Sequence, residues 1–152
     1  MSSLRRAQHV LVAEPRPEDL HSIISAIGGG GHLLVTHSRT GSEVIEVLQN
    51  SGKPGMRPMP SVLLLDLELD DPGPIELITK LRACPRTRCM PIVALDPGAS
   101  RELVGNAYAA GINSCLSKPA SYEEFQAMIE RLTRYWLRLN QLPHQLGAAS
   151  ST

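Results

Sequence analysis

The sequence predicts a three-layer, doubly wound α/β fold in which helices cover both faces of a five-stranded parallel sheet. Five short apolar runs alternate with segments of helical periodicity, which is typical of such a fold. The run that ends at Asp66 is apolar throughout, as expected of a strand covered on both faces. Charged residues follow several of the runs, and ligands of parallel sheets bind beyond the carboxyl ends of the strands.

The first strand is expected at residues 9–13, and Glu14 follows it directly. Pro17 suits the first position of a helix, which leucine and isoleucine at helical spacing extend to about residue 27. Residues 28–31 are four glycines and end this helix. No Gly-Lys-Ser/Thr follows them, so we interpret them as a connection to the second strand, residues 32–36.

Residues 40–43 have the spacing of a capping box and predict the start of the second helix. A segment rich in glycine and proline, residues 50–60, leads into the central strand at residues 62–66. An acidic turn follows at residues 67–73, and Pro74 opens the third helix.

The fourth strand is expected at residues 91–95, directly before Asp96. Ser100 is expected to cap the next helix and Gly111 to end it. Residues 112–116 form the fifth strand, after which Ser117-Lys118-Pro119 carries a lysine to the same edge of the sheet. A second capping box at residues 121–124 begins the last helix.

The composition describes one globular domain without a strong charge. The 152 residues are 42% hydrophobic, and 15 basic residues balance 15 acidic ones. We therefore expect no nucleic-acid partner and no membrane partner. Three cysteines and the lack of a secretory signal favour the cytoplasm. The domain is expected to span residues 8–142, between a flexible arm at 1–7 and a disordered tail at 143–152.

Over about residues 8–140, the sequence resembles the receiver domain of two-component response regulators (CheY-like proteins). Five pieces in order carry the resemblance: Val-Leu-Val-Ala-Glu14, Leu-Leu-Leu-Asp66, Pro-Ile-Val-Ala-Leu, Ala-Tyr-Ala-Ala-Gly111 and Ser-Lys118-Pro119. The resemblance implies a flavodoxin-like sheet with strand order 2-1-3-4-5. It also implies that Asp66 accepts a phosphoryl group from a histidine kinase. Lys118 would pair with that group, and its bond to Pro119 would be cis.

The resemblance further implies a Mg²⁺ ion held by Glu14, Asp66, the backbone carbonyl of Glu68 and waters. Magnesium prefers such hard oxygen ligands. However, Pro15 stands where the family usually has a second acid, and a proline has no side-chain oxygen, so the expected site is weak.

Two switch positions also depart from the family. Asp96 replaces a serine or threonine, and its charge would repel a nearby phosphate by roughly 1–4 kcal/mol. Cys115 replaces an aromatic residue, and in the turn after Asp66 the usual Asp-Gly gives way to Gly73-Pro74. We therefore favour a pseudo-receiver, with phosphorylation at Asp66 impaired or absent and Asp96 supplying a fixed charge near Lys118.

Two alternatives remain open: a fully phosphorylatable receiver, and a small flavodoxin-like enzyme that binds a ligand. The three acids and the lysine at one edge could do acid–base work. We nevertheless expect a signalling protein rather than an enzyme, because no glycine-rich phosphate loop opens a helix after a strand. A thermal-shift screen with nucleotides and flavin would separate these classes.

The last helix continues its apolar pattern beyond the length that a receiver needs. Its end is similar to that of stand-alone receivers which partner phytochromes. Large rings favour interface cores, so we expect a homodimer through Tyr135, Trp136 and Leu139. No effector domain is expected after this helix, so output would pass to a downstream protein target.

Overall fold

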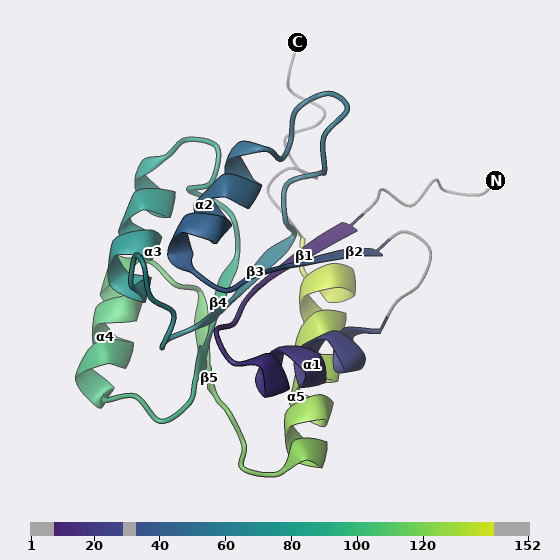
Figure 1. Ribbon diagram of the computed structural model, residues 1–152, viewed down its shortest axis with the longest axis vertical. Coiled ribbons are helices and arrows are strands. Elements are labelled where there is room, and N and C mark those ends of the chain that lie inside the picture. Colours follow the sequence, from purple (N-terminus) through teal and green to yellow (C-terminus); the bar gives the residue numbers. More distant parts are fainter. Residues whose placement is uncertain (1–7, 29–32, 142–152) are drawn as a thin grey trace, which may run out of the picture.

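The computed structural model describes residues 8–28 and 33–141, and five parallel strands form its central sheet in the order β2-β1-β3-β4-β5 (Figure 1). The strands are β1 (Gln8–Ala13), β2 (Leu33–Ser38), β3 (Val62–Asp66), β4 (Ile92–Asp96) and β5 (Ser114–Ser117). The predicted fold class and strand order are confirmed.

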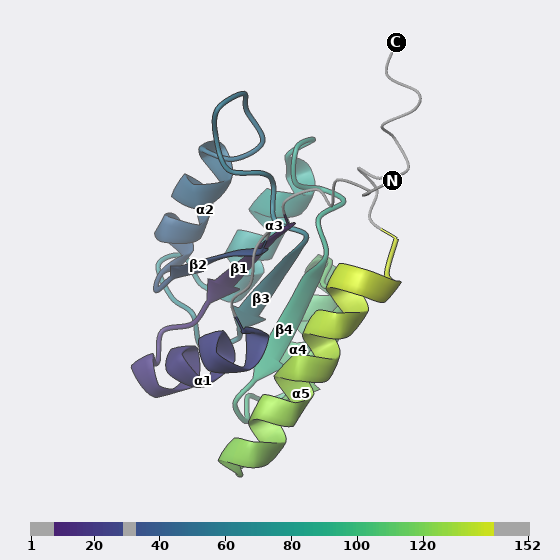
Figure 2. The ribbon, with the colours of Figure 1, turned by 90° about the vertical axis from the view of Figure 1, so that its right-hand side faces the viewer.

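Helices cover both faces of the sheet (Figure 1, Figure 2). They are α1 (Pro17–Ile27), α2 (Gly41–Gln49), α3 (Pro74–Ala83), α4 (Arg101–Ala110) and α5 (Tyr122–Arg134). Two of them, α1 and α5, pack against one face, while α2, α3 and α4 pack against the other. Because successive side chains of a strand point to opposite faces, Leu63 and Leu65 join one hydrophobic cluster and Leu64 joins the other.

This two-sided burial explains the unbroken apolar run of β3. All five of its residues are buried, including Asp66. Burying one leucine side chain contributes about 1.5–3 kcal/mol. The central strands therefore form a rigid support, and they position the residues that follow them at the carboxyl edge of the sheet.

Three helix starts have the side-chain caps that the sequence predicts. The hydroxyls of Thr40, Ser100 and Ser121 each accept a hydrogen bond from the backbone N–H three residues later, at 3.2, 3.1 and 3.2 Å. Each such cap is worth about 1 kcal/mol. Pro17 and Pro74 occupy the starts of α1 and α3, also as expected.

The end of the last helix differs from the expectation of one continuous α-helix. After Arg134 the chain forms a π-helix, Tyr135–Leu139, in which the backbone N–H of Asn140 donates to the carbonyl of Tyr135 at 2.7 Å. This wider i→i+5 turn was not visible in the apolar pattern, because periodicity does not distinguish the two helix types over a single turn.

Several other boundaries also shift. Relative to the expectation, β2 ends two residues later, β5 begins two residues later, and β4 includes Asp96. The expected cis bond before Pro119 is wrong: within the described residues the cis peptide bond is Asp71–Pro72. The predicted arm (1–7), most of the glycine segment and the predicted tail (143–152) lie outside the described residues.

A buried histidine near the start of β1 joins this strand to β2 and to the loop before β3, at the amino edge of the sheet. His9 is 0% exposed, and its Nδ1 donates to the carbonyl oxygen of Pro58 at 2.8 Å. Nε2 then accepts from the Thr36 hydroxyl at 2.6 Å. Burial lowers the pKa of His9 below its ordinary value of 6.5; the charge of Arg57 adds to this, and the bond to Pro58 opposes it.

We expect His9 to make the protein less stable in acid. Below about pH 6.5 the unfolded chain binds a proton at His9 that the folded chain resists, so the contribution of His9 to the free energy of unfolding falls as the pH drops. Glu14, whose pKa is raised to about 7, contributes the opposite slope over the same range. One proton limits the slope to about 1.4 kcal/mol per pH unit. Urea denaturation between pH 7 and pH 5 measures it.

The control variant His9→Asn can still donate to Pro58 but does not titrate, and it keeps the contribution of Glu14. As the pH drops, the free energy of unfolding of the natural chain should therefore fall relative to that of the variant. An imidazole NMR titration that gives His9 a pKa above 6.5 contradicts the prediction.

Candidate functional site

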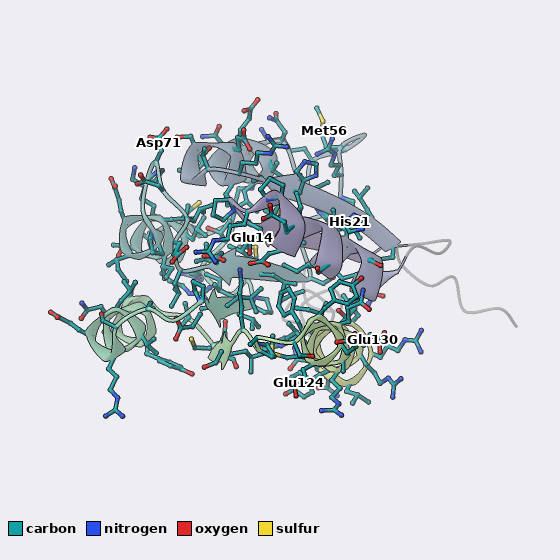
Figure 3. All side chains as sticks on the ribbon, turned by 60° about the horizontal axis from the view of Figure 1, so that its bottom comes forward. Glu14, His21, Met56, Asp71, Glu124 and Glu130 are labelled. Carbon is teal, nitrogen blue, oxygen red and sulfur yellow. The ribbon has the colours of Figure 1, made fainter. Side chains whose placement is uncertain are left out.

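The carboxyl edge of the sheet gathers the charged residues that the sequence places after the strands. Glu14 follows β1, Asp66 ends β3, Asp96 ends β4, and Lys118 follows β5. Asp66 lies opposite Leu95, so Asp96 is one residue beyond its partner in the parallel register. Figure 3 looks toward this edge, and Glu14 lies near the middle of the view, beside α1.

The ammonium group of Lys118 is the centre of this edge. Its Nζ donates to Glu14 Oε2 at 2.8 Å, to Asp19 Oδ2 at 2.6 Å and to Asp66 Oδ2. A lysine ammonium has three N–H donors, so each is matched by one carboxylate. The side chain of Lys118 is 7% exposed, those of Glu14 and Asp66 are 0% exposed, and that of Asp19 is 28% exposed. We call Glu14, Asp19 and Asp66 the acid cluster.

Backbone amides orient two members of the acid cluster. Asp66 Oδ1 accepts from the backbone N–H of Glu68 at 2.6 Å, which leaves Oδ2 for the lysine. Glu14 Oε1 accepts from the backbone N–H of Arg16 at 3.2 Å, which leaves Oε2 for the lysine. In both cases the turn after the strand supplies the N–H group. The local chain path therefore fixes the direction of each carboxylate.

Three carboxylates share one ammonium, so the acid cluster holds more negative than positive charge. Burial and, to a smaller extent, the neighbouring Asp66 carboxylate raise the pKa of Glu14 to about 7, against the opposing effect of Lys118. Burial alone would lower the pKa of Lys118, but its bonds to Asp19, Asp66 and Glu14 raise it overall. Lys118 therefore remains charged at neutral pH.

The sequence predicted Glu14, Asp66 and Lys118 at this edge but missed Asp19. Asp19 lies in the first turn of α1, two residues after Pro17. The expectation considered only residues that directly follow strands. An acid in the first turn of a helix that starts beside the same edge was the available signal, since Pro17 fixes where the helix begins.

The acid cluster offers oxygen ligands of the kind that divalent cations prefer. One ligand oxygen from each of the three residues lies within 4.8 Å of the others. Glu68, predicted to contribute its backbone carbonyl, uses its side chain in an ion pair with Arg16. Its role as a carbonyl ligand stays a prediction.

Asp96 is at the predicted edge, but its carboxylate binds its own loop. Its Oδ1 accepts from the backbone N–H groups of Gly98 and Ala99 at 2.9 and 2.6 Å. Among the described residues, the carboxylates that bind Lys118 are those of the acid cluster, and Asp96 is not one of them. Its expected role as a fixed charge near Lys118 stays a prediction. Its loop supplies two amides that satisfy the carboxylate instead.

Cys115, the second predicted switch residue, is half-buried and packs against the cluster under α2, α3 and α4. Its backbone N–H donates to the hydroxyl of Tyr108 at 3.1 Å. Tyr108 lies on α4 and is half-exposed. An aromatic ring therefore lies beside β5, but α4 supplies it and β5 does not.

The predicted interface residues lie at the end of α5. The rings of Tyr135 and Trp136 meet edge to face with centroids 5.1 Å apart. Tyr135 is 48% exposed and Leu139 is 69% exposed, whereas Trp136 packs partly on its own core. Beside them runs a groove of about 910 Å³ between β5 and α5, whose apolar lining includes Leu116 and Trp136.

Removing the lysine should leave the acid cluster unbalanced. We expect Lys118→Met to lower the free energy of unfolding by about 3–5 kcal/mol in metal-free buffer, because it leaves buried carboxylates without their partner. Urea denaturation with a chelator present measures this loss.

The matched control is Lys80→Met, because Lys80 is exposed and its ion-pair partner within residues 8–28 and 33–141 is Glu76 on the same helix. It should change stability by less than about 0.5 kcal/mol. If Lys118→Met is as stable as the natural chain, the ammonium does not hold the acid cluster together.

Comparisons with known proteins place this geometry in context. No family model matches the chain. The probable methanogenesis regulatory protein FilR2 of Methanothrix harundinacea is 34% identical over 89 residues, which cover 59% of this chain and 57% of that protein. The chain thus matches less than two thirds of the length of this relative. Response regulator Rcp1 of Synechocystis is 26% identical over 105 residues, 69% of this chain and 71% of Rcp1.

Solved structures agree with the fold. The phosphorylated cyanobacterial phytochrome response regulator RcpA superimposes with a TM-score of 0.81 at 21% identity, over 90% of this chain and 98% of that one. The Mn²⁺-bound form of Rcp1 gives a TM-score of 0.78 at 22% identity, over 90% and 99%. In sequence and in fold, this chain therefore resembles the receiver domains of response regulators, among them phytochrome response regulators.

Proposed function

We propose that this chain is a receiver domain of a two-component phosphorelay, a cytoplasmic signalling protein that acts through protein contacts. One observation carries the proposal: the buried carboxylate of Asp66, at the end of the central strand, binds the ammonium of Lys118. The likeness to phytochrome response regulators makes a histidine kinase, and a phytochrome in particular, the expected source of input. The net charge of zero offers no drive toward nucleic acid.

In such a receiver, Asp66 is the nucleophile. One of its carboxylate oxygens would bond to the phosphorus of a phosphohistidine while the bond from phosphorus to the imidazole nitrogen breaks. Lys118, already beside Asp66, would then pair with a phosphoryl oxygen as a compact positive charge. A divalent cation, when bound by the acid cluster, neutralises phosphoryl charge. Mn²⁺ in Rcp1 supports an ion of this kind.

We propose that phosphorylation at Asp66 is impaired or absent, because the residues that would respond to it are missing. Asp96 has no hydroxyl to donate to a phosphoryl group, and two loop amides hold its carboxylate. Its charge at the same edge opposes a phosphate by roughly 1–4 kcal/mol. Cys115 lacks the ring that would change rotamer. The domain would then present one conformation to its partners.

The second candidate is a fully phosphorylatable receiver, and Asp19 favours it. Pro15 removes one acid from the expected set, but Asp19 brings another carboxylate to the same lysine. Asp19 would thus replace the metal ligand that is missing at Pro15, and the metal site would not be impaired. A small ligand-binding enzyme has no comparable observation in its favour among the described residues.

The two candidates differ in their response to small phosphodonors. Because of Asp96 and Cys115, we expect acetyl phosphate or beryllofluoride with Mg²⁺ to produce little change. Intact mass measures phosphoryl transfer. Fluorescence of Trp136, the one tryptophan of the sequence, measures conformational change near the groove.

The control for this experiment is Asp66→Asn, which lacks the nucleophile, run beside a receiver of known activity. Stoichiometric addition of one phosphoryl group to the natural chain, absent from Asp66→Asn, would establish the phosphorylatable candidate instead.

We also propose a symmetric homodimer through Tyr135, Trp136 and Leu139. Two of these large apolar side chains are unusually exposed, and the lining of the groove beside them combines apolar residues of α5 and β5 with the charged residues Glu124 and Arg131. Aromatic residues in such positions dominate the energy of interfaces. A two-fold axis would let the same patch serve both chains. The downstream target would bind a surface outside this patch.

The dimer predicts that Leu139→Glu shifts the chain toward monomer. Leu139 is 69% exposed, so the change should leave the monomer folded while it places two charges in a symmetric interface. We expect association to weaken at least about tenfold, a cost of about 1.4 kcal/mol. Sedimentation velocity across a concentration series measures this.

Met56→Glu is the matched control, because Met56 is an exposed apolar residue of the loop between α2 and β3. It should not alter association. A natural chain that sediments as a monomer at about tens of micromolar contradicts the dimer.

A further inference from the structure

The first turn of α1 brings the Asp19 carboxylate to the acid cluster, and Pro15 stands where receiver domains usually have an acid. From the geometry of the acid cluster we propose that Asp19 is a direct ligand of a divalent cation, together with Glu14 and Asp66. It would take the place of the acid that is missing at residue 15. This inference rests on the proposed function only in expecting a receiver-type metal site at this edge.

The charge balance of the acid cluster favours a cation beyond Lys118. Glu14, Asp19 and Asp66 carry up to three negative charges around one ammonium. An ordinary salt bridge needs a single carboxylate for each lysine, and unbalanced carboxylates in a buried site repel one another. A divalent ion would neutralise the two charges that Lys118 leaves.

The donor set fits such an ion. All three ligands are carboxylate oxygens within 4.8 Å of one another, and Mg²⁺ and Mn²⁺ favour one or more carboxylates completed by water. Pro15 contributes no side-chain oxygen. Backbone amides already fix the orientation of Glu14 and Asp66, so those two ligands are preorganised.

Asp19 differs from the other two in its access to solvent. Its side chain is 28% exposed, whereas those of Glu14 and Asp66 are 0% exposed. Asp19 therefore lies where a hydrated ion would enter the site, and the ion could keep several of its waters there. Asp19 lies in the first turn of α1, where the helix dipole favours a negatively charged side chain.

The ion and the ammonium of Lys118 would compete for the same oxygens. Lys118 binds each of the three carboxylates directly, so a metal at the acid cluster has to replace at least part of these contacts. Asp19 is the partner that the lysine can lose with least cost, because it is the partly hydrated one.

The test uses the full chain and Mn²⁺ alone, with free Mn²⁺ followed by electron paramagnetic resonance. We expect Asp19→Asn to weaken Mn²⁺ binding at least tenfold. The control is Glu18→Gln, which removes the same charge from the same helical turn at a residue outside the acid cluster. It should weaken binding by less than twofold, because it changes only the distant field.

A second variant makes the result specific to a ligand. Pro15→Asp in the Asp19→Asn background returns an acid to the first loop and should recover most of the lost affinity. Thermal melts in chelator confirm that each variant is folded.

The proposal is overturned if the natural chain does not bind Mn²⁺ at millimolar concentration. It is also overturned if Asp19→Asn and Glu18→Gln weaken binding equally, or if Pro15→Asp restores nothing. No phosphodonor is present, so these outcomes are separate from those of the phosphorylation experiment.

Discussion

The sharing of one lysine ammonium by three carboxylates is the interaction on which this domain depends. Lys118 joins segments that are far apart in the chain: the loop after β1, the start of α1 and the end of β3. In a buried site the three carboxylates need the positive charge of this ammonium, because unpaired buried charges are costly. The excess negative charge of the acid cluster also attracts further cations to the carboxyl edge of the sheet. The contacts that stabilise this edge of the sheet are therefore the same ones that give it an affinity for cations.

The fold creates this arrangement through the parallel register. Because β1, β3, β4 and β5 run in the same direction, the residues after them meet at one edge without any local sequence signal. The sequence therefore allowed Glu14, Asp66 and Lys118 to be predicted as neighbours. The central strand could be predicted with its exact bounds because helices cover it on both faces, which demands an unbroken apolar run.

What the sequence did not reveal depends on side-chain reach and on local turns. Asp19 belongs to a helix, and its contact with Lys118 requires knowing how α1 lies across the edge of the sheet. Asp96 was placed correctly at that edge. However, the loop after it, with Gly98 at positive φ, turns two backbone amides toward the Asp96 carboxylate, so these amides bind it in place of Lys118. The π-helix at Tyr135 likewise depends on packing that periodicity does not encode.

The placement of Lys118 also bears on how a domain without the usual switch residues could communicate. Its neighbour Pro119 lines the groove between β5 and α5, together with Trp136. If a cation took the oxygens of the acid cluster, Lys118 would have to give up part of its contacts there, and Pro119 is its direct neighbour in the chain. The backbone N–H of Lys118 donates to the carbonyl of Asp96 at 2.8 Å, so the end of β4 is tied to the same point. The acid cluster and the groove are therefore joined through the backbone at Lys118 and Pro119, without a hydroxyl at residue 96 or a ring at residue 115.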